Sequence, residues 1–312
     1  MVCWIRASPM ARAVGVPLAA VAHGAPSALA SASRPRVLAY PQLVIGGVAF
    51  ALLLVGAVLG PLVVGYSPMA ADFSAALSGP STSHVFGADQ LGRDSLSRAM
   101  SGARLSLLVA AGTVILSLGG GVPLGLLSGL RRGWIESLIM RIIDGLLAFP
   151  GLILAMAIAF VLGPSLPTVI VALGVVRLAP LARVVRSQAL SLGHCDYVES
   201  ARAMGANSAR IALAHVLPNI LSTILVQASL TAGAAIFAEA SLSFLGAGVP
   251  PPTPTWGGML HDAYPYLETN PWLTFVPGAC IFLAVLSCNF IGEGIRDLLD
   301  PRERTRRGTR AA

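Results

Sequence analysis

The chain contains no lysine, although it has 312 residues, and all 21 of its basic residues are arginines. A P-loop ATPase needs the lysine of its GxxxxGK[ST] loop to reach the phosphates, and a Schiff-base enzyme needs a lysine amine. The sequence therefore excludes both kinds of site. Any energy from ATP has to come from another protein, which would hold the ATP and Mg²⁺.

Charge is also scarce. Only 11% of the residues are charged, whereas 55% are hydrophobic, and soluble domains carry roughly a quarter of charged residues. Several apolar runs exceed the roughly 18 residues that mark a membrane helix. We therefore expect an all-α integral membrane protein rather than a soluble one.

The sequence also lacks the usual catalytic motifs. Neither HExxH nor GxSxG occurs, and no cluster of residues has the spacing of a metal site. We expect no catalytic residues, no metal and no cofactor of the chain's own. An intramembrane protease would need a nucleophile and base inside the spans, and a secondary transporter would be expected to carry internal repeats. We find neither, so both remain distant alternatives.

Six apolar segments are long enough to cross a membrane. They run approximately over Pro41–Val64, Leu105–Leu130, Trp134–Leu162, Leu166–Val185, the stretch from Pro218 to Leu245, and Trp272–Ile291. Between and beyond them lie four arginine groups: Arg34 and Arg36; Arg131 and Arg132; Arg183, Arg186, Arg202 and Arg210; and the cluster that starts at Arg302. With six spans all four groups fall on one side, which the positive-inside rule makes the cytoplasm. We expect both termini there, and no nucleic-acid partner.

This pattern divides the chain into four parts. Residues 1–36 are predicted to be a disordered and dispensable cytoplasmic tail, and 37–101 the first transmembrane helix with an extracytoplasmic segment. The third part, 102–292, is the main transmembrane domain and contains a polar loop over 191–219. The fourth, 293–312, is a cytoplasmic C-terminal tail.

The loop over 191–219 predicts two short helices on the cytoplasmic surface. Tyr197, Ala201 and Met204 recur at helical spacing and predict an apolar face. Gly205 can take the positive φ that ends a helix, and Asn207 or Ser208 can cap the next one. By helix physics alone, this is an ordinary amphipathic surface segment.

Its spacing, however, resembles a known motif. Glu199, Ala201, Gly205, Leu217 and Pro218 fit the EAA motif of bacterial ABC import permeases: Glu-Ala-Ala, three residues, Gly, nine residues, Ile, any residue, Leu-Pro. Ser200 and His215 depart from it. The run from His215 to Asn219 (His-Val-Leu-Pro-Asn) is similar to the peptide and nickel branch of that family.

Three further segments resemble the C-type permeases of dipeptide and oligopeptide importers. They are His84–Asp94, Ala238–Gly246 and Asn289–Arg302, so the likeness covers roughly residues 37–302 in order. The resemblance implies a type I ABC importer permease fold in the bacterial inner membrane. It also implies four kinds of partner: a homologous second permease, two cytoplasmic ATPase subunits, an extracytoplasmic solute-binding protein and membrane lipid. The EAA residues would couple the chain to an ATPase.

The implied cargo is a dipeptide or oligopeptide, with nickel chelate, glutathione or haem as alternatives. Two charged residues inside the spans are candidates for the transport path. Arg177 lies deep in the fourth span, where an arginine must snorkel, pair or face water, and Glu239 lies near the outer end of the fifth. For Glu239, pairing with an arginine of the outer loop is the plainer alternative. We expect Arg141 and Asp144, three residues apart, to pair with each other, and the alternative is that they line a polar pathway.

Overall fold

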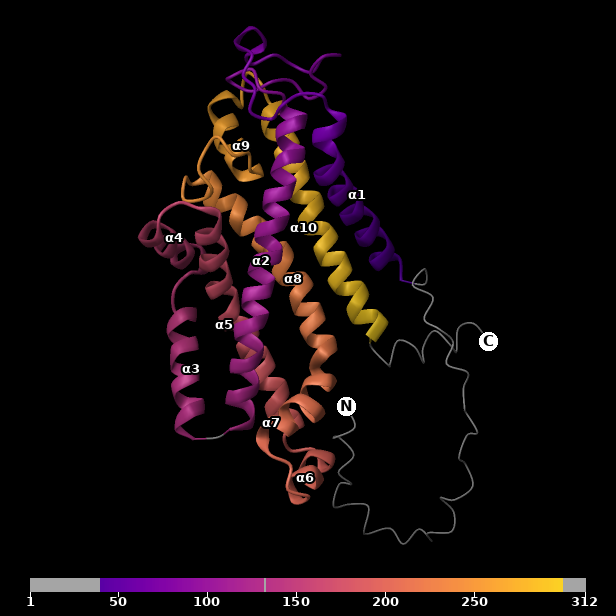
Figure 1. Cartoon of the computed structure of the whole chain (residues 1–312), viewed down its shortest axis with the longest axis vertical. Coiled ribbons are helices and arrows are strands. Elements are labelled where there is room, and N and C mark those ends of the chain that lie inside the picture. Colours follow the sequence, from indigo (N-terminus) through magenta and orange to yellow (C-terminus); the bar gives the residue numbers. More distant parts are fainter. Residues whose placement is uncertain (1–39, 132, 300–312) are drawn as a thin grey trace, which may run out of the picture.

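The structure is a computed structural model, which describes residues 40–131 and 133–299. Five long helices form its body: α1 (Pro41–Val63), α2 (Ser95–Leu130), α5 (Leu166–Leu192), α8 (Leu217–Phe244) and α10 (Trp272–Leu299). Shorter helices lie beside them or at their ends (Figure 1): α3 (Trp134–Leu147), α4 (Gly151–Leu162), α6 (Asp196–Ala203), α7 (Ser208–Arg210) and α9 (Trp256–Ala263). The predicted tail 1–36 and the part of 293–312 beyond Leu299 lie outside the described residues.

The all-α membrane fold is confirmed, with one difference in the third predicted span. The five long helices are each long and apolar enough to cross a membrane. In place of a continuous span from Trp134 to Leu162, α3 and α4 meet at an angle of 92°. Pro150 stands at the junction as the residue before α4. Proline donates no amide hydrogen and disfavours helical geometry in the residue before it, which ends α3 there.

Three of the helices are longer than the apolar runs that predicted them. α2 begins at Ser95 rather than Leu105, because the Asp94 carboxylate caps it by accepting a 2.7 Å hydrogen bond from the Ser97 amide. α5 continues beyond Val185 to Leu192, and α10 continues to Leu299. Polar residues extend these helices past their apolar parts, and hydropathy alone does not detect them.

Small residues let α2 and α5 pack closely along their length. Gly121, Gly125 and Gly129 are spaced four apart on α2 and face α5. A Cβ atom at Gly125 would lie 2.6 Å from the Cβ of Val185 and 2.7 Å from the carbonyl oxygen of Ala182. Helices in membranes associate through such small-residue stripes, because lipid provides no hydrophobic drive between them.

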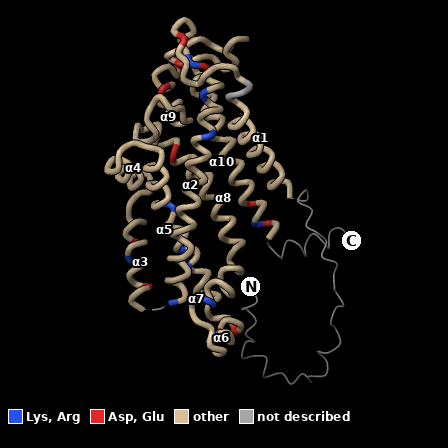
Figure 2. Tube along the Cα trace, in the orientation of Figure 1, with Lys and Arg blue, Asp and Glu red and all other residues tan. Residues whose placement is uncertain are grey.

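Charged residues gather towards the two ends of the bundle (Figure 2). α6 and α7 lie at one end, whereas α9 and the segment over 64–94 lie at the other. The middle of the bundle is mostly apolar. The fold thus offers two polar ends and a core between them as candidate functional regions.

Candidate coupling surface and transport path

The EAA segment folds into two short helices, as the sequence predicts. α6 ends at Ala203, and Gly205 follows with φ +87°. α7 begins at Ser208, and the Asn207 side chain caps it by accepting a 2.8 Å hydrogen bond from the Arg210 amide. The helix pair lies at one end of the bundle (Figure 1).

The predicted apolar face of α6 is wrong in two of its three residues. Val198 belongs to a buried cluster that joins α6 to α2, α5 and α8, and Ala201 is also buried. Tyr197 is 43% exposed and Met204 83% exposed. An eight-residue helix buries only a narrow stripe, and Val198 with Ala201 already fills it. Tyr197 and Met204 are therefore left on the open surface.

Some EAA residues are buried against the bundle, and the others are exposed at the surface. Ala201 is buried and Leu217 half-buried, whereas Glu199, Gly205 and Pro218 are exposed. The buried members hold the segment against the bundle. The exposed members lie on a surface that the described residues leave open, and the exposed Met204 directly precedes Gly205.

Between α7 and α8 the chain forms a π-helical stretch, Ile211–Val216, that the sequence analysis missed. The Leu217 amide bonds to the carbonyl of Ala212, five residues back. Pro218 has no amide to continue the normal ladder, and the Asn219 side-chain amide donates to the His215 carbonyl at 2.6 Å. The Leu-Pro-Asn run could have indicated this stretch from the sequence. It places a proline, which lacks a backbone N–H donor, beside an asparagine whose side chain can donate instead.

Arg177 lines a cavity of about 470 Å³ that lies between α5, α8 and the junction of α3 with α4. The Arg177 Nη2 lies 3.5 Å from the carbonyl oxygen of Ala234. Apolar side chains make up most of the cavity walls, among them Leu146, Phe149 and Phe237. A charged group thus faces a mostly apolar hollow that is open to the surface, because Phe149 is 60% exposed and Phe237 62% exposed.

Glu239 occupies a different environment, at the interface of α2 and α8. Its side chain is fully buried. It accepts a 2.9 Å hydrogen bond from Ser106 Oγ and a 2.8 Å one from Ser243 Oγ. The structure therefore does not place Arg177 and Glu239 in one site, and hydroxyl groups surround the carboxylate in place of the expected arginine.

The expected pairing of Arg141 with Asp144 is wrong. Asp144 pairs with Arg183 of α5, and Glu136 pairs with Arg186 one turn further along. Both pairs join α3 to α5 across the helix interface. The packing of α3 against α5 brings these opposite charges together. Arg141 and Asp144 lie on one helix, and no neighbouring element that the structure describes holds their side chains together.

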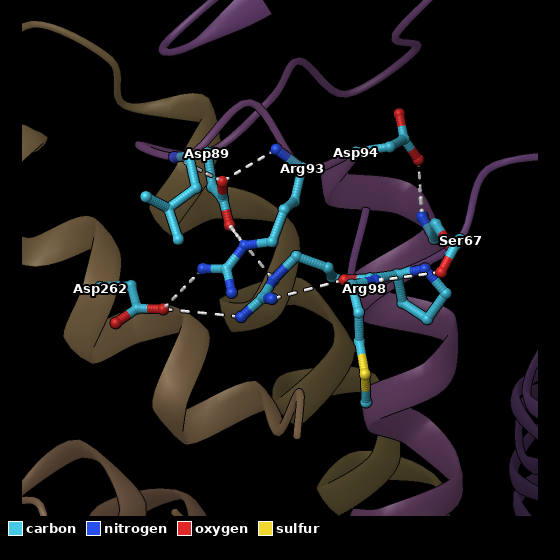
Figure 3. A network of polar contacts seen from close by, with 10 residues as sticks. Ser67, Asp89, Arg93, Asp94, Arg98 and Asp262 are labelled. Carbon is cyan, nitrogen blue, oxygen red and sulfur yellow. Dashed lines mark hydrogen bonds and ion pairs between the residues drawn. The ribbon is translucent and has the colours of Figure 1, made fainter. Parts of the chain in front are cut away.

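At the opposite end of the bundle, two arginines are buried among carboxylates (Figure 3). Arg93 Nε lies 2.7 Å from Asp89 Oδ2, and Arg98 Nε lies 3.3 Å from the same oxygen. Asp262 of α9 is 3.6 Å from Arg93 and 3.5 Å from Arg98. These pairs fasten the segment over 64–94 to α2 and α9. The sequence analysis predicted neither Asp89 nor Asp262 as a partner of these arginines.

The segment's own turns support this cluster. His84 Nδ1 lies 3.0 Å from Asp94 Oδ1. Gly92 has φ +73°, and a Cβ there would lie only 1.7 Å from the carbonyl oxygen of Asp72. Glycine is therefore required at this position, both for the backbone angle and for the close approach. The pattern over His84–Asp94 thus has a structural explanation, as a compact cap on the bundle.

Comparison with known proteins identifies the family. Residues 121–305 match the protein family described as the binding-protein-dependent transport system inner membrane component. The chain belongs to this family. It is 42% identical to the dipeptide transport system permease protein DppC of Alkalihalophilus pseudofirmus, over 83% of this chain and 85% of that protein. It is 40% identical to the di/tripeptide transport system permease protein DppC of Pseudomonas aeruginosa, over 90% of this chain and 97% of that protein.

Two further similarities bear on the expectations. The glutathione transport system permease protein GsiD of Pectobacterium atrosepticum is 43% identical, over 74% of this chain and 77% of that protein. A solved chain from the inward-facing MetNI methionine ABC transporter has a TM-score of 0.56 at 21% identity, and covers 65% of this chain and 97% of that one. The latter likeness shows the fold of an ABC importer permease.

The family membership establishes the general role. The chain is an inner-membrane permease of an ABC importer, a transport component rather than an ATPase. Such permeases work with ATPase and binding-protein components. The resemblance found in the sequence motifs is confirmed.

Proposed function

We propose that this permease imports dipeptides or oligopeptides. The observation that carries the proposal is the name of its relatives: proteins 40–42% identical over most of the chain are dipeptide or di/tripeptide permeases. Glutathione is a second candidate, because a relative of equal identity is a glutathione permease. Nickel chelate and haem remain alternatives from the sequence resemblance alone.

In this proposal the chain forms half of the translocation path. A homologous second permease supplies the other half, two ATPase subunits bind on the cytoplasmic side, and a solute-binding protein docks on the outer side. Both termini then face the cytoplasm, and lipid surrounds the spans. ATP and Mg²⁺ bind to the ATPase subunits.

Coupling is assigned to the exposed part of the EAA segment. Glu199 and Gly205 would lie in a groove of one ATPase, while Ala201, buried beneath them, transmits movement to the bundle. Support comes from the geometry: an exposed glycine turn follows α6, and Val198 of α6 belongs to a buried cluster that includes residues of α2, α5 and α8. Leu217 and Pro218 begin α8, so movement of the segment passes directly into a spanning helix.

Of the two candidates for the path, the surroundings favour Arg177. It lines a cavity, whereas Glu239 has no exposed surface and is bonded by two serines. We assign Glu239 to the packing of α2 against α8 rather than to cargo.

Uptake measurements test the cargo. Cells with and without this chain should be compared for uptake of labelled dipeptides, oligopeptides, glutathione, nickel and haem. We expect loss of peptide uptake in cells without the chain. Unchanged peptide uptake, with loss of another solute, would overturn the cargo while leaving the permease role intact.

A further inference from the structure

Arg177 is a charge placed deep in a spanning helix without a carboxylate partner in the described part of the chain. It lies about 17 Å along α5 from Leu166, at 1.5 Å rise per residue. Its recorded polar contact is with the Ala234 carbonyl oxygen at 3.5 Å, which is long for a hydrogen bond. Ionisable residues at such depth are costly, and usually pair or face a water-filled path. The neighbours of Arg177 therefore leave its donors available.

The cavity beside Arg177 has room for a ligand group. Its volume of about 470 Å³ is within the range of small-molecule sites. The walls that are not Arg177 are largely apolar, including Phe149, Leu152 and Phe237. Beside apolar walls the attraction between a guanidinium and an anion is stronger than in bulk water, because the local dielectric constant is lower. The cavity thus suits a negatively charged group attached to an organic body.

A second feature at the same cavity favours an anion. Gly151 and Leu152 line it, and they are the first two residues of the twelve-residue α4. The first amides of a helix have no acceptor within the helix, and no side chain caps this one. A Cβ at Gly151 would lie 3.0 Å from the Val176 side chain, next to Arg177 in sequence. The 92° break between α3 and α4 is what brings this helix end to α5.

We propose that Arg177 binds the carboxylate of the cargo at this cavity during transport, and that it thereby sets a preference for cargo with a free carboxyl terminus. A guanidinium offers parallel N–H donors that match the two oxygens of a carboxylate. The amino-terminal end of α4 adds partial positive charge on the same side. The inference rests on the proposed function, because it assumes that the cargo is a peptide.

The test compares a labelled dipeptide with its carboxyl-terminal amide in the complete transporter, reconstituted with its binding protein. The measured quantity is the ratio of acid to amide transport. The binding protein is the same in every sample, so its own preference cancels between variants. We expect Arg177→Gln to lower the ratio about tenfold, as for the loss of hydrogen bonds to a charged group. Arg141→Gln, which alters an exposed arginine on α3, should leave the ratio unchanged.

Arg177→Lys serves as the second variant, and decides the matter if Arg177→Gln does not assemble. It keeps a positive charge at the cavity, so part of the preference should remain. An assembled Lys variant with no acid preference would overturn the inference. So would a Gln variant that slows acid and amide equally, since that result indicates a packing role.

Two further outcomes separate the inference from its premises. If the intact transporter moves neither peptide form, the proposed cargo fails and this site fails with it. If it moves peptides but Arg177→Gln keeps the original ratio, only the site fails. Vesicles with and without anionic lipid should give the same ratio. A preference that depends on anionic lipid would instead assign the site to a lipid phosphate.

Discussion

Replacing Gly205 isolates the contribution of one backbone turn to coupling. Gly205 has φ +87°, and a Cβ atom built there has no neighbour within 4 Å. A substitution therefore meets no steric contact, and its cost is the left-handed conformation alone. That cost is about 1–2 kcal/mol for an L-residue, which corresponds to about a 5- to 30-fold change in the equilibrium constant between the native turn and other conformations. β-Branched valine should fall at the upper end.

The structure supplies a matched control. Gly133, in the turn between α2 and α3, has φ +105° and also has no atom within 4 Å of a built Cβ. Gly133 also has ψ −147°, a conformation close to the region that only glycine occupies, so Gly133→Val introduces backbone strain outside the EAA segment that is at least as large. Gly205→Asn is a second control, because asparagine tolerates positive φ better than other residues with a Cβ.

The assay measures the amount of assembled complex, cargo uptake, and ATP hydrolysis stimulated by the binding protein. We expect Gly205→Val to assemble and to lose up to about 30-fold of uptake and stimulated hydrolysis. Gly205→Asn should lose less, and Gly133→Val should keep most of both activities. Normal uptake in the Gly205→Val complex, or an equal loss in Gly133→Val, would refute the assignment of coupling to this turn.

Substitutions at three other sites, two of them with a control substitution, test the packing. Gly125→Leu should prevent assembly, because its Cβ would already overlap α5. Gly119→Leu is the control and should assemble normally, because a Cβ built at Gly119 has no atom within 4 Å. The yield of complex after detergent extraction measures assembly of both variants. Glu239→Ala should destabilise the protein by about 1–3 kcal/mol because two buried serines lose their acceptor. Glu239→Gln keeps an acceptor oxygen and should destabilise it less. Equal melting temperatures of the original protein and both variants would contradict the hydrogen-bond assignment. Asn219→Ala removes the donor to the His215 carbonyl and should raise amide exchange over 211–216 while leaving α10 unchanged; identical exchange would show that the π-helical stretch does not depend on this bond.

Local rules predicted much of the coupling segment. A glycine free to take positive φ, a capping asparagine and a proline at a helix start act within a few residues, so Gly205, Asn207 and Pro218 could be placed from sequence. The direction in which α6 faces could not. It depends on how α2, α5 and α8 close around Val198, and these helices are distant in the sequence.

The partners and surroundings of the charged residues were even harder to predict from the sequence. The sequence placed Arg177 inside a span, but the cavity beside it depends on the break between α3 and α4. Asp144 was expected to pair within its own helix and instead reaches Arg183 on α5. Asp262 gave no signal at all, because its partners are more than 150 residues earlier in the chain. Pairing across helices is decided by tertiary packing, and periodicity within one helix carries no information about it.

The cluster of Asp89, Arg93, Arg98 and Asp262 has a consequence for the surroundings in which the protein can work. Its charges balance, and their separations of 2.7–3.6 Å are far below the roughly 10 Å Debye length of 0.1 M salt. Asp89, Arg93 and Arg98 are also buried, so dissolved ions have little access to them. The cytoplasm has a regulated ionic composition, but the fluid on the proposed outer side does not. The cap over 64–94 should therefore keep its shape in both dilute and saline media.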